Sequence, residues 1–517
     1  MINTLADITR THRAERPDDI ALRVPGQRDW TFEQLDTDAC TCANALRDAG
    51  IDEGGRIAFL AKNEAEFFVY LYGGAKLGAV SVAVNWRLAP PEMEYILNHS
   101  EAEILLISEE FLGHLKQMNL NLDQVVVLGD PGDSGYSTWD QWLSGHSDKD
   151  IVVDINPDDT CFQLYTSGTT GLPKGVETTH ANLTTMMSQG LKELSFSSES
   201  ISLVCMPLFH ISGSAWGVLG QYMACRSILL REVDMAEILR AIEAERVTHS
   251  VFVPAVLQFL AAFPGIEDID FSSLQTVCYG ASPITEEVLV TAMRLFNAEF
   301  FQVYGLTETT GGVTMLAPDE HDPGGERAGL LRSCGKVIDN HEIRIVNPET
   351  GDNMPESEVG EIWIRGPQVM KGYWRNPEAT SEAIDADGWF KSGDAGYMVD
   401  GYVYIHDRVK DMIISGGENI YPAEIENALM KHEGISDAAV IGVPSERWGE
   451  TVKAIITRSD DSLSEEDLIS FCRQQLAHYK CPTSIDWMDE IPRNPSGKIL
   501  KTELRKPYWE GKDRNVS

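Results

Sequence analysis

The chain has 517 residues, of which 43% are hydrophobic and 8% aromatic, so it can bury large cores and is expected to be globular. Its 42 lysines and arginines stand against 80 aspartates and glutamates, and the formal charge of −38 disfavours nucleic acid and anionic membranes as partners. The nine cysteines form no C-x-x-C pair, and no signal peptide or apolar run of roughly 20 residues is visible, so we expect a cytoplasmic protein without a transmembrane segment.

The first half of the chain alternates short apolar runs with amphipathic stretches. Four runs have the pattern of buried strands, at residues 56–63, 79–85, 102–108 and 124–129. Helices are expected between them, and Thr31 followed by Gln34 has the capping-box spacing that predicts the start of the first. This alternation predicts right-handed βαβ units in sheets that helices cover on both faces.

The pattern changes near residue 408, where a strand pattern gives way to a charged patch and a glycine-rich loop. Pro422 fits an early position of the next helix. The runs AAVIGV, VKAIIT and SIDWM then predict strands, and Ser462 with Glu465 predicts the cap of another helix.

These patterns predict an α/β protein with two domains. We expect a large, multi-subdomain N-terminal domain over residues 1–407, built on parallel-rich sheets. A small, mobile α+β cap over residues 408–517 would follow, with the hinge at 408–411.

A short stretch at residues 164–180, LYTSGTTGLPKGVETTH, has the composition of a phosphate-binding loop. It is not a Walker P-loop, because a proline separates Gly171 from Lys174 and Gly175 stands where the magnesium-binding hydroxyl should be. It does not fit the glycine-rich lid of kinases either. Successive backbone N–H groups in such a turn can still form a concave anion site, to which the hydroxyls add donors and Lys174 a charge.

Four further motifs follow this loop in a fixed order. They are YGLTE at 304–308, GWFKSGD at 388–394, DRVKDMIISGGENIYP at 407–422 and PRNPSGK at 492–498. Together the five motifs resemble the adenylate-forming superfamily, which contains acyl-CoA synthetases, luciferases and the adenylation domains of peptide synthetases. The resemblance covers nearly the whole chain and points to the branch of fatty-acid–CoA ligases.

The resemblance implies that the chain binds ATP and Mg²⁺. The loop would hold the β- and γ-phosphates, which leave as pyrophosphate. Tyr304 offers a flat face to adenine, Thr307 a hydroxyl to the α-phosphate, and Glu308 an oxygen ligand to Mg²⁺. Asp394 and Arg408 would contact the ribose. The implied ATP- or AMP-binding set is Thr166, Ser167, Gly168, Thr169, Thr170, Lys174, Gly280, Ala281, Ser282, Tyr304, Gly305, Thr307, Asp394, Arg408 and Lys498.

Lys498 resembles the catalytic lysine of the superfamily. A carboxylate that attacks the α-phosphorus of ATP is repelled by it, and a cation between the two would position the nucleophile and stabilise the developing charge. The resemblance makes Lys410 the residue about which the cap rotates between the two half-reactions. Thr307, Glu308 and His210 complete the group of predicted catalytic residues.

Coenzyme A is the thiol substrate that the resemblance implies. The glycine-rich loop would line the channel for pantetheine, and the implied set is Ser415, Gly416, Gly417, Trp448, Tyr479 and Lys480. Some relatives carry basic residues at positions matching Cys481 and Thr483, so the contact to the 3′-phosphate stays unassigned.

His210 resembles an aromatic gate between the ATP side and the acid pocket. The segment HISGSAWGVLG contains no acidic residue that could pair with an ammonium group, which disfavours an amino acid as substrate. Its small residues would leave room for a long apolar pocket, although tight helix packing also explains them. The predicted pocket residues are His210, Gly213, Ser214, Ala215, Gly217, Gly311 and Gly312.

The leading hypothesis is an acyl-CoA synthetase that activates a medium- or long-chain fatty acid as acyl-AMP and transfers it to CoA. The alternatives are a ligase for aryl, cyclic or steroid side-chain acids, a luciferase-like enzyme, and a stand-alone adenylation protein. A non-enzymatic nucleotide-binding scaffold is disfavoured, since Lys174, Glu308, Asp394 and Lys498 are all present. The sequence leaves a homodimer open.

Overall fold

The protein forms two compact units in the computed structural model, which describes residues 2–166, 172–190, 194–282, 284–348, 350–408, 411–415, 418–445, 447–459, 462–493 and 499–510. The first unit runs to Leu331 and includes Gly335–Glu342 and Arg365–Phe390. The second holds Arg332–Cys334, Ile343–Ile364 and the chain from Lys391 onward. The second unit also includes strands that precede residue 407. The predicted domain boundary at residue 407 and the predicted movement of the domain that follows it therefore stay predictions.

One sheet of the first unit contains all four strands expected in the first half of the chain. Its strands lie in the order β19 (Gly372–Tyr373), β9 (Lys174–Thr179), β8 (Thr160–Thr166), β4 (Val80–Ala83), β3 (Arg56–Leu60), β5 (Ala102–Ser108), β6 (Gln124–Leu128) and β7 (Ser137–Thr138). The strands from β8 through β4, β3, β5 and β6 to β7 are parallel, whereas β9 and β19 add antiparallel neighbours at one edge. The expectation of a parallel-rich sheet is therefore confirmed.

A second sheet of the first unit carries the YGLTE motif. Its strands follow the order β16 (Lys336–Val337), β15 (Gly311–Leu316), β14 (Glu299–Leu306), β13 (Thr276–Gly280), β12 (His249–Phe252), β10 (Ile201–Val204), β11 (Arg226–Leu229), β1 (Ile20–Arg23) and β2 (Asp29–Thr31). The strands from β14 to β1 are parallel, so their carboxyl ends share one edge, where α/β sheets bind ligands.

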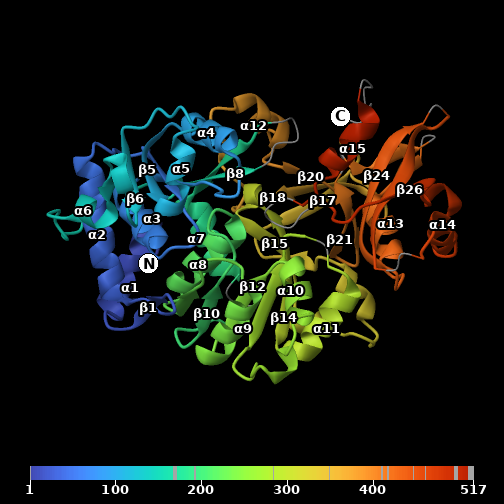
Figure 1. The fold of residues 1–517 in the computed structure, drawn as a ribbon, viewed down its shortest axis with the longest axis horizontal. Coiled ribbons are helices and arrows are strands. Elements are labelled where there is room, and N and C mark those ends of the chain that lie inside the picture. The colour runs from blue at the N-terminus through green and yellow to red at the C-terminus, as the bar shows by residue number, and fades with distance from the viewer. Residues whose placement is uncertain are drawn as a thin grey trace. The chain divides into compact units, whose positions relative to one another are not determined.

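Helices cover these sheets on both faces. The helices of this unit are α1 (Leu5–Glu15), α2 (Phe32–Asp48), α3 (Glu66–Leu77), α4 (Pro90–His99), α5 (Leu112–Leu115), α6 (Trp139–Leu143), α7 (His180–Gly190), α8 (Ile211–Tyr222), α9 (Met235–Ala244), α10 (Pro254–Ala261), α11 (Glu286–Phe296) and α12 (Pro377–Ala383). Figure 1 shows α9, α10 and α11 beside β12 and β14, and α2 and α3 beside β6. In α2 the hydroxyl of Thr31 accepts a hydrogen bond from the N–H of Gln34, as predicted.

Successive side chains of β3 alternate between two hydrophobic cores of the first unit. Ile57 and Phe59 point into the main core, while Ala58 and Leu60 point into a smaller core beneath α4. Helix α3 is buried from Phe67 to Leu77, so it is apolar all round and lies within the main core.

The second unit contains two groups of strands. One has the order β17 (Glu342–Val346), β18 (Gly360–Arg365), β20 (Phe390–Val399) and β21 (Tyr402–Arg408). The other is a sheet with β23 (Glu418–Ile420), β22 (Ile413–Ser415), β25 (Gly449–Arg458) and β24 (Ile435–Ser445), with β26 (Ser484–Trp487) parallel to β25.

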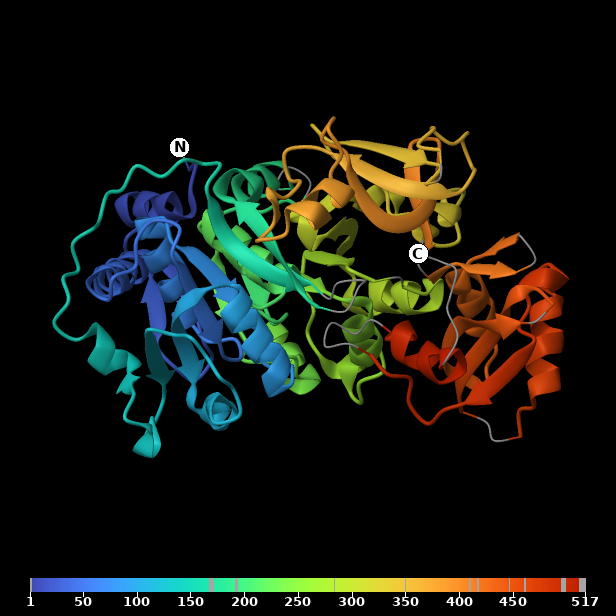
Figure 2. The same cartoon turned by 90° about the horizontal axis from the view of Figure 1, so that it is seen from above.

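That sheet is covered by α13 (Pro422–Leu429) and α14 (Glu465–Arg473) on one face and by α15 (Lys501–Trp509) on the other (Figure 2, orange and red). Along β24, Ala438 and Val440 join the core beneath α13 and α14, whereas Ala439 and Ile441 join the core beneath α15. The predicted strands and the place of Pro422 at the start of α13 are confirmed. The predicted cap of α14 is wrong by two residues, because Ser464 and not Ser462 accepts the hydrogen bond, from the N–H of Asp467.

All nine cysteines are free and buried. Among the described residues, no helix is long and apolar enough to cross a membrane.

Candidate active site

The predicted phosphate-binding loop connects two antiparallel strands. Strand β8 ends at Thr166 and β9 begins at Lys174, and these two residues are direct partners in the ladder. The loop therefore closes a hairpin and does not open a helix. Ser167, Gly168, Thr169 and Thr170 lie outside the described residues.

A polar contact fixes the base of this hairpin. The hydroxyl of Tyr165 lies 2.8 Å from Nδ1 of His99 and accepts a 3.0 Å hydrogen bond from Nε2 of Gln163. Burial raises the pKa of Tyr165 and lowers the pKa of His99, so both groups are neutral near pH 7. Tyr165, the residue that precedes Thr166, is thus uncharged and lies next to the predicted phosphate-binding loop.

The YGLTE motif spans the carboxyl end of β14. Tyr304 is buried within the strand, and Thr307 begins a 3-10 turn over Thr307–Thr309. Gly305 packs against the neighbouring β15 so closely that a Cβ there would lie 1.8 Å from the carbonyl oxygen of Gly311. The sheet brings Tyr304, Thr307 and Glu308 to one edge.

Glu308 is the point at which the two motifs meet. Its Oε1 accepts a hydrogen bond of 3.4 Å from the hydroxyl of Thr166 and one of 3.0 Å from the hydroxyl of Tyr373. The ammonium of Lys174 lies 4.9 Å from the centre of the same tyrosine ring. Lys174 and Glu308 therefore share one neighbour, Tyr373, which sequence reasoning missed, and Thr166 donates to the same oxygen of Glu308 as that tyrosine does.

The turn that carries Glu308 is held by the segment before Tyr373. The N–H of Met370 donates to the carbonyl oxygen of Glu308 at 2.8 Å. The buried amide of Gln368 donates to the carbonyl oxygens of Thr309 and Gly312 at 3.2 and 3.1 Å. These bonds fix the backbone at Glu308 and in the residues that follow it.

The donor set around Glu308 fits a magnesium ion bound with nucleotide. Mg²⁺ is commonly held by one or two carboxylates together with substrate phosphates and water. The described parts of the chain contain no group of three or more His, Cys, Asp or Glu side chains that could bind a metal ion without such help. Glu308 beside Lys174 therefore fits an ion that arrives with ATP.

Gly280, Ala281 and Ser282, which belong to the predicted nucleotide-binding set, lie at the end of β13 or just after it. Gly280 is the last residue of that strand, and Ala281 has a positive φ of 68° that turns the chain toward Ser282. Strand β13 is parallel to β14, so this turn and YGLTE lie at the same edge of the sheet.

The predicted acid pocket centres on α8, where the structure explains the glycines by packing. A Cβ on Gly213 would lie 2.2 Å from the carbonyl oxygen of Pro207, and one on Gly217 would lie 2.7 Å from the ring of Phe68. Ser214 and Ala215 are buried, and Nδ1 of His210 lies 3.3 Å from the hydroxyl of Ser212. Gly311 and Gly312 begin β15. Their role in binding an acid stays a prediction.

In the second unit, the two predicted ribose contacts are brought together. Asp394 on β20 and Arg408 on β21 are direct partners across an antiparallel ladder, and Asp394 is buried. Among the predicted CoA contacts, Ser415 pairs with Gly449, the residue after the half-exposed Trp448.

Lys480 is engaged within its own unit. Its ammonium donates to both oxygens of Glu424, at 2.8 and 2.7 Å, and the neighbouring Tyr479 is exposed. Lys410, Gly416, Gly417 and Lys498 lie outside the described residues.

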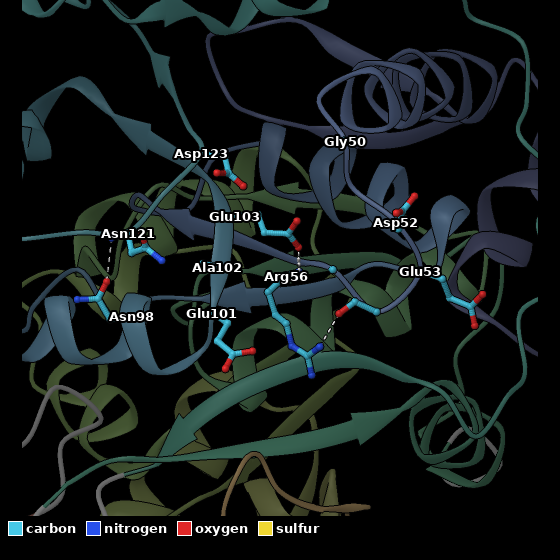
Figure 3. A pocket seen from close by; sticks show the side chains of 12 residues that line it. Gly50, Asp52, Glu53, Arg56, Asn98, Glu101, Ala102, Glu103, Asn121 and Asp123 are labelled. Atoms are coloured by element: carbon cyan, nitrogen blue, oxygen red, sulfur yellow. Dashed lines mark hydrogen bonds between the residues drawn. The ribbon is translucent and has the colours of Figure 1, made fainter.

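A polar cleft of about 620 Å³ lies elsewhere in the first unit (Figure 3). It is lined by Gly50, Asp52, Glu53, Gly54, Gly55, Arg56, Asn98, Glu101, Ala102, Glu103, Asn121 and Asp123. These residues precede β3, β5 and β6 or begin them, so the cleft lies at the amino ends of parallel strands. That is the edge opposite to the one at which α/β sheets bind substrates.

Comparison with known proteins identifies the family. The family described as AMP-binding enzyme matches residues 9–374, and the AMP-binding enzyme C-terminal domain matches residues 424–498. A fatty acid–acyl-carrier-protein ligase of Streptomyces coeruleorubidus is 37% identical over 100% of this chain and 98% of its own length. A feruloyl-CoA synthase of an Amycolatopsis species is 37% identical over 92% of this chain and 94% of its own.

The fold agrees with these matches. The structure of a Mycobacterium tuberculosis fatty acyl CoA synthetase superposes with a TM-score of 0.78 at 31% identity and covers 99% of both chains. The chain belongs to the family of AMP-binding enzymes, the adenylate-forming superfamily that its five ordered motifs resemble.

Proposed function

We propose that this adenylate-forming acid–thiol ligase activates a hydrophobic carboxylic acid, in the first instance a medium- or long-chain fatty acid, and transfers it to CoA. In the first half-reaction an oxygen of the carboxylate forms a bond to the α-phosphorus of ATP, and the bond to pyrophosphate breaks. In the second, the thiol attacks the acyl carbon, and AMP leaves. The observation that carries this proposal is that Thr166 donates to Glu308, while Tyr373 contacts both Glu308 and Lys174.

The roles that we propose for the individual residues follow from their chemistry. Lys174 would hold the phosphates that leave, Thr307 the α-phosphate and Tyr304 the adenine, while Asp394 would accept hydrogen bonds from the ribose. Glu308 would hold Mg²⁺, which neutralises phosphate charge when it is bound. Arg408 would support the ribose, and Lys498 would bridge the carboxylate and the α-phosphate.

The hydrophobic acid is supported by α8, which follows His210 and contains no acidic side chain over Ile211–Tyr222. An aromatic acid is the second candidate. It is favoured by the ring of Phe68 against Gly217, because this contact fills space that a long alkyl chain would otherwise use. Relatives of both kinds have similar identity to this chain.

The thiol acceptor also has a second candidate. CoA differs from the pantetheine arm of a carrier protein by its adenosine 3′-phosphate, which cations commonly bind. The ammonium of Lys480 is paired with Glu424, and the next residue, Cys481, is buried. These contacts, together with the carrier-protein ligase among the relatives, favour a carrier protein as the alternative acceptor.

A two-way screen tests the proposal. The protein is incubated with ATP, Mg²⁺, one acid and one acceptor, and the release of AMP and pyrophosphate is measured. Fatty acids of several chain lengths and cinnamic acids form one axis, and CoA, pantetheine and an acyl carrier protein form the other. We expect AMP release that depends on a fatty acid and on CoA. Release of ADP would place the attack at the γ-phosphate and contradict the assignment.

Lys498→Ala provides the matched variant for this screen. It should lower acid-dependent pyrophosphate release by about 10²-fold or more, because it removes a preorganised cation from the transition state. Transfer from a chemically prepared acyl-adenylate to CoA should be spared. Lys116→Ala, at an exposed position, is the control and should change neither step. Equal loss of both steps in Lys498→Ala would show that the residue has a structural role instead.

A further inference from the structure

A short segment connects the two halves of the nucleotide site. This strap, residues 368–374, pairs with β9 through β19. The N–H of Lys371 donates to the carbonyl oxygen of Glu177 at 3.0 Å, and the N–H of Trp374 donates to that of Gly175 at 2.8 Å. On its other side, Met370 and Gln368 hold the turn that carries Glu308. The strap therefore joins the strand that begins with Lys174 to the carboxylate proposed to hold Mg²⁺.

Tyr373 is the residue of the strap whose side chain touches both functional groups. Its hydroxyl donates to Oε1 of Glu308 at 3.0 Å, and its ring lies 4.9 Å from the ammonium of Lys174. The hydrogen bond is charge-assisted and directional, so it orients the carboxylate. The ring face attracts the cation without forming a bond that a phosphate would have to break.

The two hydroxyl groups that contact the Glu308 side chain bind the same carboxylate oxygen. The hydroxyls of Tyr373 and Thr166 both donate to Oε1, so within the part of the chain that the structure describes neither of them occupies Oε2. A carboxylate held in this way presents its second oxygen in a fixed direction. That arrangement suits a ligand of Mg²⁺, an ion that demands a strict octahedral geometry.

We propose that Tyr373 is a positioning residue that sets Glu308 and Lys174 in register, so that Mg²⁺ and the phosphates of ATP are bound together. This inference rests on the proposed function of the same site. In this proposal the hydroxyl of Tyr373 supports the binding of Mg²⁺ through Glu308, and its ring supports the binding of phosphate through Lys174. The two parts of one side chain should then have separable effects.

The separation can be measured by calorimetry on the full-length protein with ATP as the probe, at several concentrations of MgCl₂ and with EDTA. Tyr373→Phe keeps the ring and removes the hydroxyl. We expect it to raise the Mg²⁺ concentration needed for half-maximal ATP binding by about tenfold, the size of one hydrogen bond to a charged group. ATP binding in EDTA should stay at the wild-type level.

Tyr373→Leu removes both groups and should weaken ATP binding in EDTA as well, because Lys174 loses its ring. Tyr136→Phe deletes a hydroxyl from an exposed loop position and serves as the control. Thermal melting of each variant identifies loss of folding. The backbone pairing of β19 needs no hydroxyl, so Tyr373→Phe should melt near the wild-type temperature.

Two results would overturn the proposal. One is a Tyr373→Phe protein whose Mg²⁺ dependence matches the wild type. The other is equal weakening of binding with and without Mg²⁺, which is the signature of general damage to the site. A wild-type protein that binds Mg·ATP but releases no AMP with any acid would contradict the proposed function, and the Mg²⁺ titrations would still decide the role of Tyr373.

Discussion

At Gly305 there is no space for any side chain, because a Cβ would lie 1.8 Å from the carbonyl oxygen of Gly311 on β15. We expect Gly305→Ala to force β14 and β15 apart, at a cost of about 1–3 kcal/mol or more, and to displace Glu308 three residues later. Denaturant unfolding and ATP binding measure the two effects. Gly113→Ala is the control, since a Cβ there has no neighbour within 4 Å. Equal results for both variants would contradict this account.

Two buried histidines give the protein a predicted acid sensitivity. Nδ1 of His180 accepts a 3.1 Å hydrogen bond from the N–H of Leu5, and His249 is fully buried against the ring of Phe196. Burial lowers the pKa of each to about 4. The unfolded chain, with a pKa of about 6.5, binds these protons first, so stability falls as the pH drops from about 6.5 to about 4.

His180→Gln tests this directly. Each titrating histidine contributes a slope of about 1.4 kcal/mol per pH unit in that window, and the variant should lose one such contribution. Urea unfolding at several pH values between 5 and 7 measures the slope. His146→Gln, at a partly exposed position, is the control. A variant with the wild-type slope would show that His180 titrates alike in the folded and unfolded chains.

At the residue scale, the sequence could name the members of a candidate site but not the contacts between them. YGLTE and the phosphate loop are recognisable from their own residue order. Tyr373 lies 65 residues beyond Glu308 in an ordinary KGYW stretch, and only the pairing of β19 with β9 brings its hydroxyl to that carboxylate. At Gly217 the sequence misled in a different way. The small residue suggested open space for a substrate, whereas the ring of Phe68 packs against it.

At the element scale, a buried ion cluster joins α2, α3 and the long segment before β8. The ammonium of Lys76 is fully buried and donates to Asp36 at 2.7 Å and to Asp150 at 3.0 Å. Two helices and a connecting segment with little regular structure are therefore locked by one side chain. No sequence pattern predicts this buried ion cluster, because a lysine on a helix is ordinarily solvated.

Lys76→Met should destabilise the protein by about 3–5 kcal/mol, because it leaves two carboxylates without their buried cation. The measurement is the free energy of unfolding from denaturant titration. Arg47→Met breaks an exposed pair with Asp48 and should cost less than about 1 kcal/mol. A loss in Lys76→Met no larger than in this control would mean that water screens the cluster.

The strands themselves were predictable for a simple physical reason. Continuous apolar runs such as 102–108 have neighbours on both faces of a parallel sheet, and burial on both faces is what such runs require. The helix caps were predictable only in part. No other hydroxyl near Thr31 could cap α2. Ser462 and Ser464 both precede α14, and the local sequence does not show which of the two caps it.

At the scale of the whole molecule, the separate core of the segment after residue 410 has a consequence for the proposed catalytic cycle. Asp394 and Arg408 belong to the second unit, and the resemblance places the pivot two residues later, at Lys410. The segment after the pivot forms a core of its own around Ile413, Ile425 and Leu468. A part with its own core can rotate as a rigid body, because rotation does not expose its apolar side chains.

Lys410→Pro should therefore damage the two half-reactions unequally. A hinge works because one or two residues absorb a large change in φ and ψ, and proline fixes φ near −65°. If the arrangement that proline permits is the adenylating one, acyl-AMP will form while its transfer to the thiol becomes slow. Single-turnover assays of each half-reaction measure the ratio. Lys410→Ala removes the same charge without fixing φ and should keep the wild-type ratio. Equal loss in both steps, at an unchanged melting temperature, would place the pivot elsewhere in the chain.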